Sequence, residues 1–265
     1  MRKRVFFVIF NGLSLGALPG SPEENNVDLF TLKRIYRTGK LNIPLLRNFG
    51  LFNIDGVDFG RKSCIVYSSF GRCACDPQAR EGSFIKDLIG ISGITADRFV
   101  LPSGFSFTAA GGVCRDFEDC GFAELHRTSS NKEALDVMIR AAKTNFNGIC
   151  AISVFDDLSN TVTDERYPSY VSSVNYVDRR ISQFLQLLRT GDILVITSDA
   201  AELGCMTPVM IYGEGIRGAV NLGTRASYKD IGATVSEYFG FTSDGNSFLP
   251  EIEKSNAKGK ENENQ

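Results

Sequence analysis

Short apolar runs that alternate with helical patterns constrain the fold of this chain more than any other feature. Each run has the length of one strand and few polar positions, which is typical of strands buried on both faces of a parallel sheet. Strands alternating with helices predict an α/β fold with a mainly parallel sheet. The runs lie at Arg4–Phe10, Cys64–Ser69, Gly148–Phe155, Asp192–Thr197 and Pro208–Tyr212.

Three segments have the apolar spacing of helices. Ser130 and Glu133 form a capping-box pattern that opens the first helix. The second, Pro168–Leu188, carries an apolar stripe and stops before Gly191. The third, Ser227–Phe239, begins with a Ser-x-x-Asp cap and ends at a glycine. We expect all three to pack on the sheet.

Three segments, at the two ends and in the middle of the chain, bear on how the domain is bounded. Residues 1–20 fit either a secretory signal or a first buried strand, and we favour the strand because Asn11-Gly12 breaks the apolar run early. Residues 93–120 are rich in Gly, Phe and Ser and are interpreted as a short connector. Residues 251–265 are polar and predict a disordered tail. The rest, residues 1–250, is expected to form a single domain.

The number of cysteines indicates the cellular compartment, and the net charge restricts the classes of partner. Seven cysteines, an odd number without a C-x-x-C pair, predict a reduced cytoplasmic protein. The net charge of −2 argues against nucleic-acid binding, which needs a cationic excess. No run approaches the ~20 apolar residues of a membrane-spanning helix, so we expect no membrane partner.

Polar residues follow three of the predicted strands. Asn11 follows the first, Asp156 and Asp157 follow the Gly148–Phe155 run, and Asp199 follows the Asp192–Thr197 run. In open α/β sheets ligands bind beyond the carboxyl ends of the strands, so these residues form a candidate site. The alternative is that short polar residues start turns there.

Five segments together carry a family resemblance. Towards the C-terminal end they are Asp192–Asp199 (DILVITSD), Pro208–Gly215 (PVMIYGEG) and Ala226–Leu249. At the front they are Arg2–Pro19 and Ile43–Ile54 (IPLLRNFGLFNI). These segments resemble phosphopentomutases, members of the alkaline phosphatase superfamily. The resemblance implies the three-layer α/β/α core of that superfamily, with a mainly parallel sheet.

The resemblance also implies a reaction, and the chain departs from the residues that perform it. Phosphopentomutases move a phosphoryl group between the C1 and C5 oxygens of a pentose, using two manganese ions held by aspartates and histidines and a phosphorylated threonine. Asp199 retains one metal position, whereas Asn11 and Ala200 replace an aspartate and a histidine. Asp156 or Asp157 falls near another carboxylate position, but its histidine partner falls near Thr163.

The nucleophile and the cap domain of the family have no counterpart in the sequence. The nucleophile segment falls on Gly71–Glu81 (GRCACDPQARE), which holds no threonine or serine, and only residues 93–120 are available in place of the cap. Cys73 or Cys75 beside Arg72 offers a thiolate as an alternative nucleophile. The sole histidine, His126, matches no ligand position and is expected in a loop.

The sequence therefore predicts a catalytically inactive, cap-less relative that acts as a binding, scaffold or regulatory subunit. We expect a protein partner or self-association, a small phosphorylated ligand as a further possibility, and no cofactor. The alternative is a residual phosphoester hydrolase or phosphomutase for a sugar phosphate such as ribose phosphate, with a single Mg²⁺ or Mn²⁺ on Asp199.

Overall fold

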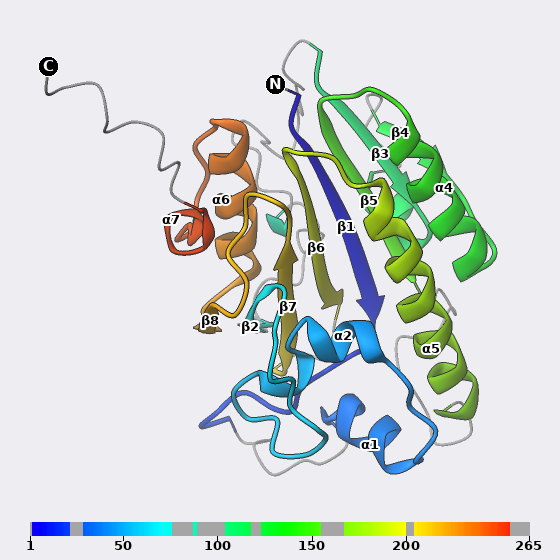
Figure 1. Cartoon of the computed structure of the whole chain (residues 1–265), viewed down its shortest axis with the longest axis vertical. Coiled ribbons are helices and arrows are strands. Elements are labelled where there is room, and N and C mark those ends of the chain that lie inside the picture. Colours follow the sequence, from blue (N-terminus) through cyan, green and yellow to red (C-terminus); the bar gives the residue numbers. More distant parts are fainter. Residues whose placement is uncertain are drawn as a thin grey trace, which may run out of the picture.

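The computed structural model describes residues 2–21, 29–75, 87–88, 104–117, 123–154, 167–199 and 204–254. Within these residues eight strands form one sheet in the order β4-β3-β5-β1-β6-β7-β2-β8 (Figure 1). Of these strands, β7 runs antiparallel to its neighbours β6 and β2, and the other pairs are parallel. The predicted α/β fold with a mainly parallel sheet is confirmed. The strands are β1 (Arg4–Asn11), β2 (Ser69–Ala74), β3 (Ser106–Ala110), β4 (Ala123–His126), β5 (Gly148–Val154), β6 (Asp192–Asp199), β7 (Met206–Tyr212) and β8 (Asn221–Arg225).

Helices cover both faces of the sheet, which gives the predicted three layers. β1 lies at the centre, and its alternate side chains enter two separate apolar cores: Phe6, Val8 and Phe10 enter one, and Val5, Phe7 and Ile9 the other. Because both faces of β1 are buried, its sequence is continuously apolar. The first core contains residues of four helices: α1 (Thr31–Arg37), α2 (Pro44–Asn48), α4 (Asn131–Lys143) and α5 (Tyr167–Phe184). The second core contains residues of α6 (Tyr228–Phe239), α7 (Leu249–Ile252) and the 3₁₀ segment η3 (Gly112–Phe117). Two further 3₁₀ turns are η2 (Leu51–Asn53) and η5 (Leu185–Leu187).

The predicted helix starts are confirmed at two caps. The Ser130 side chain accepts from the backbone N–H of Glu133 at the start of α4. The Ser227 side chain caps α6 by accepting from the backbone N–H of Lys229, and α6 ends at Gly240, whose φ of 87° is the left-handed conformation that glycine adopts easily. The Glu133 carboxylate accepts from the N–H of Ser129, one residue before the position that the capping-box pattern predicts.

A buried ion pair joins the starts of the two central strands. Arg4 Nε lies 2.8 Å from Asp192 Oδ1, and Arg4 Nη2 lies 2.5 Å from Asp192 Oδ2. Both side chains are almost fully buried, with exposed fractions of 3% and 2%. Arg4 Nη1 also donates to the carbonyls of Ala142 and Thr144 at the end of α4. The pair therefore ties β1, β6 and α4 together at one edge of the sheet.

The predicted strand at Cys64–Ser69 is wrong in position. β2 begins at Ser69, and the backbone before it makes other bonds: Tyr67 N–H donates to Asn48 O instead of to a neighbouring strand. Cys64 is exposed, and Ile65 and Tyr67 are 65% and 52% exposed. Of the apolar side chains in the run, Val66 packs against the first core.

Two segments interpreted as irregular contribute to the core. Part of the connector at residues 93–120 forms β3, which lies between β4 and β5. β3 approaches β5 closely at Gly148, where an added Cβ would lie 1.9 Å from the Ser106 carbonyl oxygen. The tail predicted at 251–265 begins too early, because Ile252 is fully buried in α7 and Glu253 bridges to Ile216. Residues 255–265 lie outside the described part of the chain.

Among the described residues, no helix has both the length and the apolar character needed to cross a bilayer.

A buried carboxylate on α5 holds the start of α2. Asp178 is fully buried and accepts from the backbone N–H groups of Leu46, at 2.8 Å, and Leu45, at 3.2 Å. Burial of the carboxyl raises the pKa of Asp178 to about 6, although these two hydrogen bonds oppose the rise.

Replacing Asp192 should destabilise the fold strongly. Asp192→Ala leaves the buried Arg4 guanidinium unpaired, so we expect the free energy of unfolding to fall by roughly 3–5 kcal/mol in urea denaturation. Asp58→Ala is the matched control, because Asp58 pairs with Lys33 at 3.4 Å with an exposed fraction of 74%. The control should lose less than about 1 kcal/mol. Equal losses in the two variants would contradict a structural role for the buried pair.

Replacing Asp178 should change the pH dependence of stability. Since folding raises the pKa of Asp178 to about 6, the native state binds a proton that the unfolded chain has released above about pH 4. The stabilisation from this raised pKa is complete below pH 4 and is lost as the pH rises through 6. In the parent protein the free energy of unfolding should therefore fall by roughly 2–3 kcal/mol between pH 4 and 7, and this fall should be absent in Asp178→Asn, as measured by urea denaturation. Parallel stability curves for the two proteins would contradict the shift.

Candidate functional site

Two of the four predicted site residues lie side by side at the carboxyl edge of the sheet. Asn11 ends β1 and Asp199 ends β6, and the parallel register pairs them directly. The chain then turns at Gly12, whose N–H donates to the Asp199 carbonyl at 2.6 Å. Both side chains are half-buried. Parallel pairing thus brings them together as expected, and their role as ligands stays a prediction.

Buried hydroxyl groups fix the backbone beneath this pair. The Ser198 hydroxyl donates to Phe10 O at 2.6 Å and accepts from Leu13 N–H at 2.9 Å. The Tyr170 hydroxyl donates to Asn11 O at 3.0 Å, and the Tyr228 hydroxyl donates to Ser198 O at 2.9 Å. Burial raises the pKa of both tyrosines, so they remain phenols that donate. The ends of β1 and β6 are therefore held rigidly.

The other predicted residues of this edge lie outside the described part of the chain. These are Asp156 and Asp157, together with the positions Ala200 and Thr163 that replace family histidines. β5 ends at Val154, in register with Phe10.

The segment that matches the family nucleophile begins as a buried strand. Cys73 lies in β2 opposite Thr207 of β7 and is fully buried, and Cys75 is 8% exposed. Burial, followed by the charge of Asp230, raises the pKa of the Cys73 thiol far above its usual range. Arg72 directs its Nε to Thr224 Oγ1 at 2.8 Å. Burial and the raised pKa argue against a reactive thiolate at Cys73, because desolvation disfavours the charged form.

The sole histidine lies away from the carboxyl ends of β1 and β6. His126 is the last residue of β4 and so is not in a loop as expected. β3 and β5 separate β4 from β1, so at ~4.8 Å between strands His126 lies about 14 Å across the sheet. Its Nε2 lies 3.1 Å from Glu124 Oε1 on the same strand. His126 is therefore not a ligand at the Asn11–Asp199 edge.

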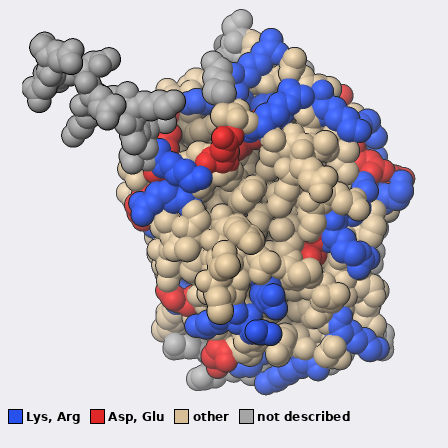
Figure 2. Space-filling view, viewed as in Figure 1, with Lys and Arg blue, Asp and Glu red and all other residues tan. Residues whose placement is uncertain are grey.

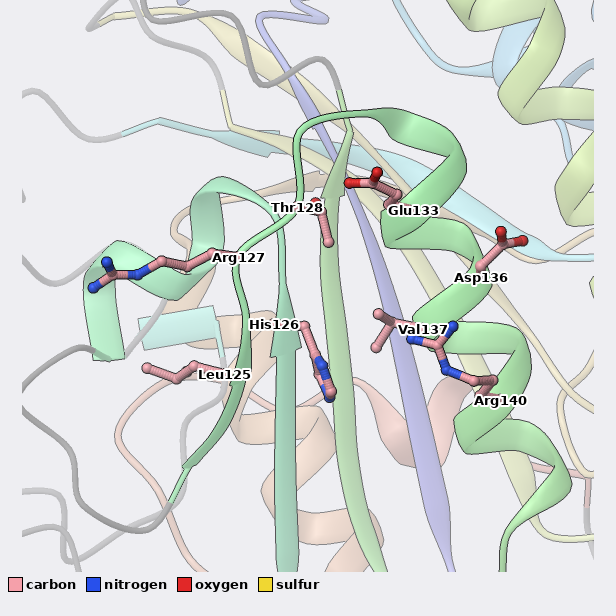
Figure 3. Close-up of a pocket in the computed structure, with 8 residues that line it drawn as sticks. All are labelled: Leu125, His126, Arg127, Thr128, Glu133, Asp136, Val137 and Arg140. Carbon is pink, nitrogen blue, oxygen red and sulfur yellow. The ribbon is translucent and has the colours of Figure 1, made fainter.

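A pocket of about 410 Å³ lies beside His126. Figure 3 shows that its lining comes from the end of β4, the residues that follow it, and one face of α4. Sequence reasoning missed the helical part, although Glu133, Asp136 and Arg140 are spaced three and four residues apart and so share a face of α4.

The described residues offer oxygen ligands for one cation at the Asn11–Asp199 edge. Among them, no group of three or more His, Cys, Asp or Glu side chains is placed to hold a metal ion. Mg²⁺ often binds through one or two carboxylates and keeps several waters, so Asp199 with the Asn11 amide oxygen fits a single such ion. The two manganese ions that phosphopentomutases use need more anionic ligands than Asn11 and Asp199 supply.

Comparison with known proteins confirms the resemblance. Residues 117–243 match the Metalloenzyme superfamily. The chain is 32% identical over 168 residues to the phosphopentomutase of Lachnoclostridium phytofermentans, which covers 57% of this chain and 42% of that relative. It is 30% identical over 170 residues to the phosphopentomutase of Acetivibrio thermocellus, covering 58% and 42%. The match therefore spans less than half the length of these curated relatives.

The fold also matches a solved structure. A protein in the alkaline phosphatase superfamily from Vibrio parahaemolyticus superposes with a TM-score of 0.51 at 9% identity, covering 91% of this chain and 67% of that chain. This similarity concerns the fold alone, and it confirms the predicted alkaline phosphatase-like core.

The expectation of no cofactor is contradicted by these comparisons. A superfamily of metalloenzymes matches residues 117–243, and the phosphopentomutase relatives are metal-dependent. The expectation relied too heavily on the missing histidines. Carboxylate, amide and water oxygens alone are sufficient for Mg²⁺ or Mn²⁺.

Alkylation should distinguish the exposed thiol from the buried ones. In native protein at pH 8 iodoacetamide should modify Cys64 well before Cys73, because Cys64 is exposed and Cys73 is buried with a raised pKa. Peptide mass spectrometry at increasing times gives the two rates, and unfolding in urea should remove the difference. Fast modification of Cys73 in the native state would restore it as a candidate nucleophile.

Proposed function

We propose that this chain is a phosphopentomutase-like protein that does not perform the mutase reaction and acts by binding, as a scaffold or regulatory subunit. One observation carries the proposal: the segment at the family's nucleophile position contains no hydroxyl residue and starts as the buried strand β2. A phosphoryl group that passes through a threonine has no acceptor there. The proposal includes the missing cap domain, although part of the connector predicted in its place, Ser106–Ala110, forms β3 of the sheet.

The metal site supports the same conclusion. The family reaction uses two ions, and the described residues of the Asn11–Asp199 edge offer one carboxylate and one amide. A single Mg²⁺ or Mn²⁺ there would polarise a phosphoryl oxygen of a bound ligand. The rigid backbone at Ser198 and Asn11 would hold the two oxygen ligands in place for binding.

The proposal also concerns what the protein binds. We infer a protein partner or self-association, with a small phosphorylated ligand as a second binding mode, and no nucleic acid or membrane partner. The cytoplasmic location that the cysteine pattern predicts is part of the same proposal. A fixed partner stoichiometry after purification from native extract would support the scaffold role.

A second candidate function is a single-metal phosphoester hydrolase or phosphomutase acting on a sugar phosphate such as ribose phosphate. The observation that favours it is the Metalloenzyme match together with the pairing of Asn11 and Asp199. In that case Asp199→Asn should abolish hydrolysis of p-nitrophenyl phosphate in the presence of Mg²⁺ or Mn²⁺. Activity that survives the substitution would come from a contaminant.

The leading proposal predicts no mutase turnover. Purified protein with added Mn²⁺ should form no ribose 5-phosphate from ribose 1-phosphate, because nucleophile and second ion are both missing. The phosphopentomutase of Lachnoclostridium phytofermentans, assayed in parallel, is the positive control. Metal analysis should give at most one Mn²⁺ per chain. Turnover together with two bound ions per chain would overturn the proposal.

A further inference from the structure

The pocket between β4 and α4 carries its own set of polar groups, separate from the Asn11–Asp199 edge. Figure 3 shows His126 on the strand and Arg140 on the helix reaching into the space between the two elements, with Val137 behind Arg140. Val137 is 4% exposed and gives the pocket an apolar wall. The volume of about 410 Å³ lies within the range of small-molecule sites.

The acidic groups of this pocket are already engaged by protein donors. The Glu133 carboxylate accepts from the Ser129 N–H at 2.8 Å and from the Ser129 hydroxyl at 3.1 Å. Asp136 pairs with Lys132 at 3.0 Å and with Arg180 at 2.6 Å. These hydrogen bonds lower the pKa of both acids, so the acids stay ionised. Neither needs a ligand cation.

Two donors of the pocket are left without such partners. Among the described residues the Arg140 guanidinium forms no hydrogen bond or ion pair, and neither does the Thr128 hydroxyl. Both side chains line the pocket, and a guanidinium and a hydroxyl are donors that bind phosphate or carboxylate oxygens. The pocket therefore offers an anion a guanidinium that forms no ion pair within the described residues, although the charge of Asp136 acts on it.

His126 contributes an acceptor. A carboxylate only accepts hydrogen bonds, so the contact of 3.1 Å between Nε2 and Glu124 assigns the ring proton to Nε2. Nδ1, the other nitrogen of the ring, is then the atom that is left to accept from a hydroxyl group of a ligand. The strand is held in place behind this ring, because Gly111 N–H donates to His126 O at 3.3 Å.

We propose that this pocket binds a compact anion that also carries hydroxyl groups, either a phosphate monoester or a hydroxy-carboxylate. Arg140 and Thr128 bind the anionic group, and His126 Nδ1 accepts from a ligand hydroxyl. The proposal does not rest on the proposed function, since it holds for an active enzyme and for an inactive relative alike.

Titration calorimetry on the full chain tests the proposal with four probes. Glycerol 3-phosphate should bind more tightly than inorganic phosphate, which lacks the carbon-borne hydroxyls, and glycerol should not bind. Gluconate replaces the phosphate by a carboxylate, so the tighter of gluconate and glycerol 3-phosphate identifies the natural class. Absence of binding by both of them at about 10 mM would overturn the proposal.

Substitutions locate the site. Arg140→Gln should weaken binding of glycerol 3-phosphate about tenfold, and Thr128→Val and His126→Ala should each weaken it about threefold. Lys143→Gln is the matched control: it removes one positive charge from the same helix, three residues further on and outside the pocket. Arg140 is exposed and makes no hydrogen bond or ion pair within the part of the chain that the structure describes, so thermal melts of its variant should match those of the parent protein.

Two outcomes would contradict the site. Unchanged affinity in Arg140→Gln would remove the anion-binding role of this residue. An equal loss in Lys143→Gln would mean that long-range charge, and not contact in the pocket, attracts the probe. A loss confined to the three pocket variants would support the proposal, whatever the result of the mutase assay.

Discussion

The buried pair of Arg4 and Asp192 sets the register on which the rest of the molecule depends. These two residues are direct partners at the start of β1 and β6. A slip of one residue would separate a buried guanidinium from its carboxylate and turn every apolar side chain of β1 to the opposite face. The same register, followed to the other end of both strands, places Asn11 beside Asp199. An interaction at one edge of the sheet thus defines the candidate site at the other.

The two candidate sites are built differently: one has a backbone fixed by buried hydroxyl groups, and the other presents a charged side chain. Beneath Asn11 and Asp199, buried hydroxyl groups of Ser198 and two tyrosines fix the backbone, so that this edge keeps its shape with few charged groups. Beside α4 the arrangement differs, because acids are neutralised locally while the Arg140 guanidinium has no contact partner among the described residues. Residues 117–243 are similar to the Metalloenzyme superfamily, and the described part of the chain presents a cation and a histidine away from the Asn11–Asp199 edge.

Sequence reasoning predicts the centre of this fold better than its margins. β1 is predictable because burial on both faces leaves a continuous apolar run, and the caps at Ser130 and Ser227 are local signals. β3 is not, since Phe107 is its only large apolar residue and its close approach to β5 at Gly148 depends on tertiary packing. At the candidate site, the pairing of Asn11 with Asp199 follows from parallel strands. The surroundings of His126 do not, because they depend on how α4 packs beside a short edge strand.

The place of β1 in the chain has a consequence for synthesis. Its hydrogen-bonding partners begin at Gly148 and Asp192, far along the sequence. At ~5–20 residues per second, the ribosome needs roughly 10–40 s to deliver the second of them. During that time the most apolar segment of the sheet, with both of its edges unpaired, is a natural substrate for a chaperone that holds nascent chains.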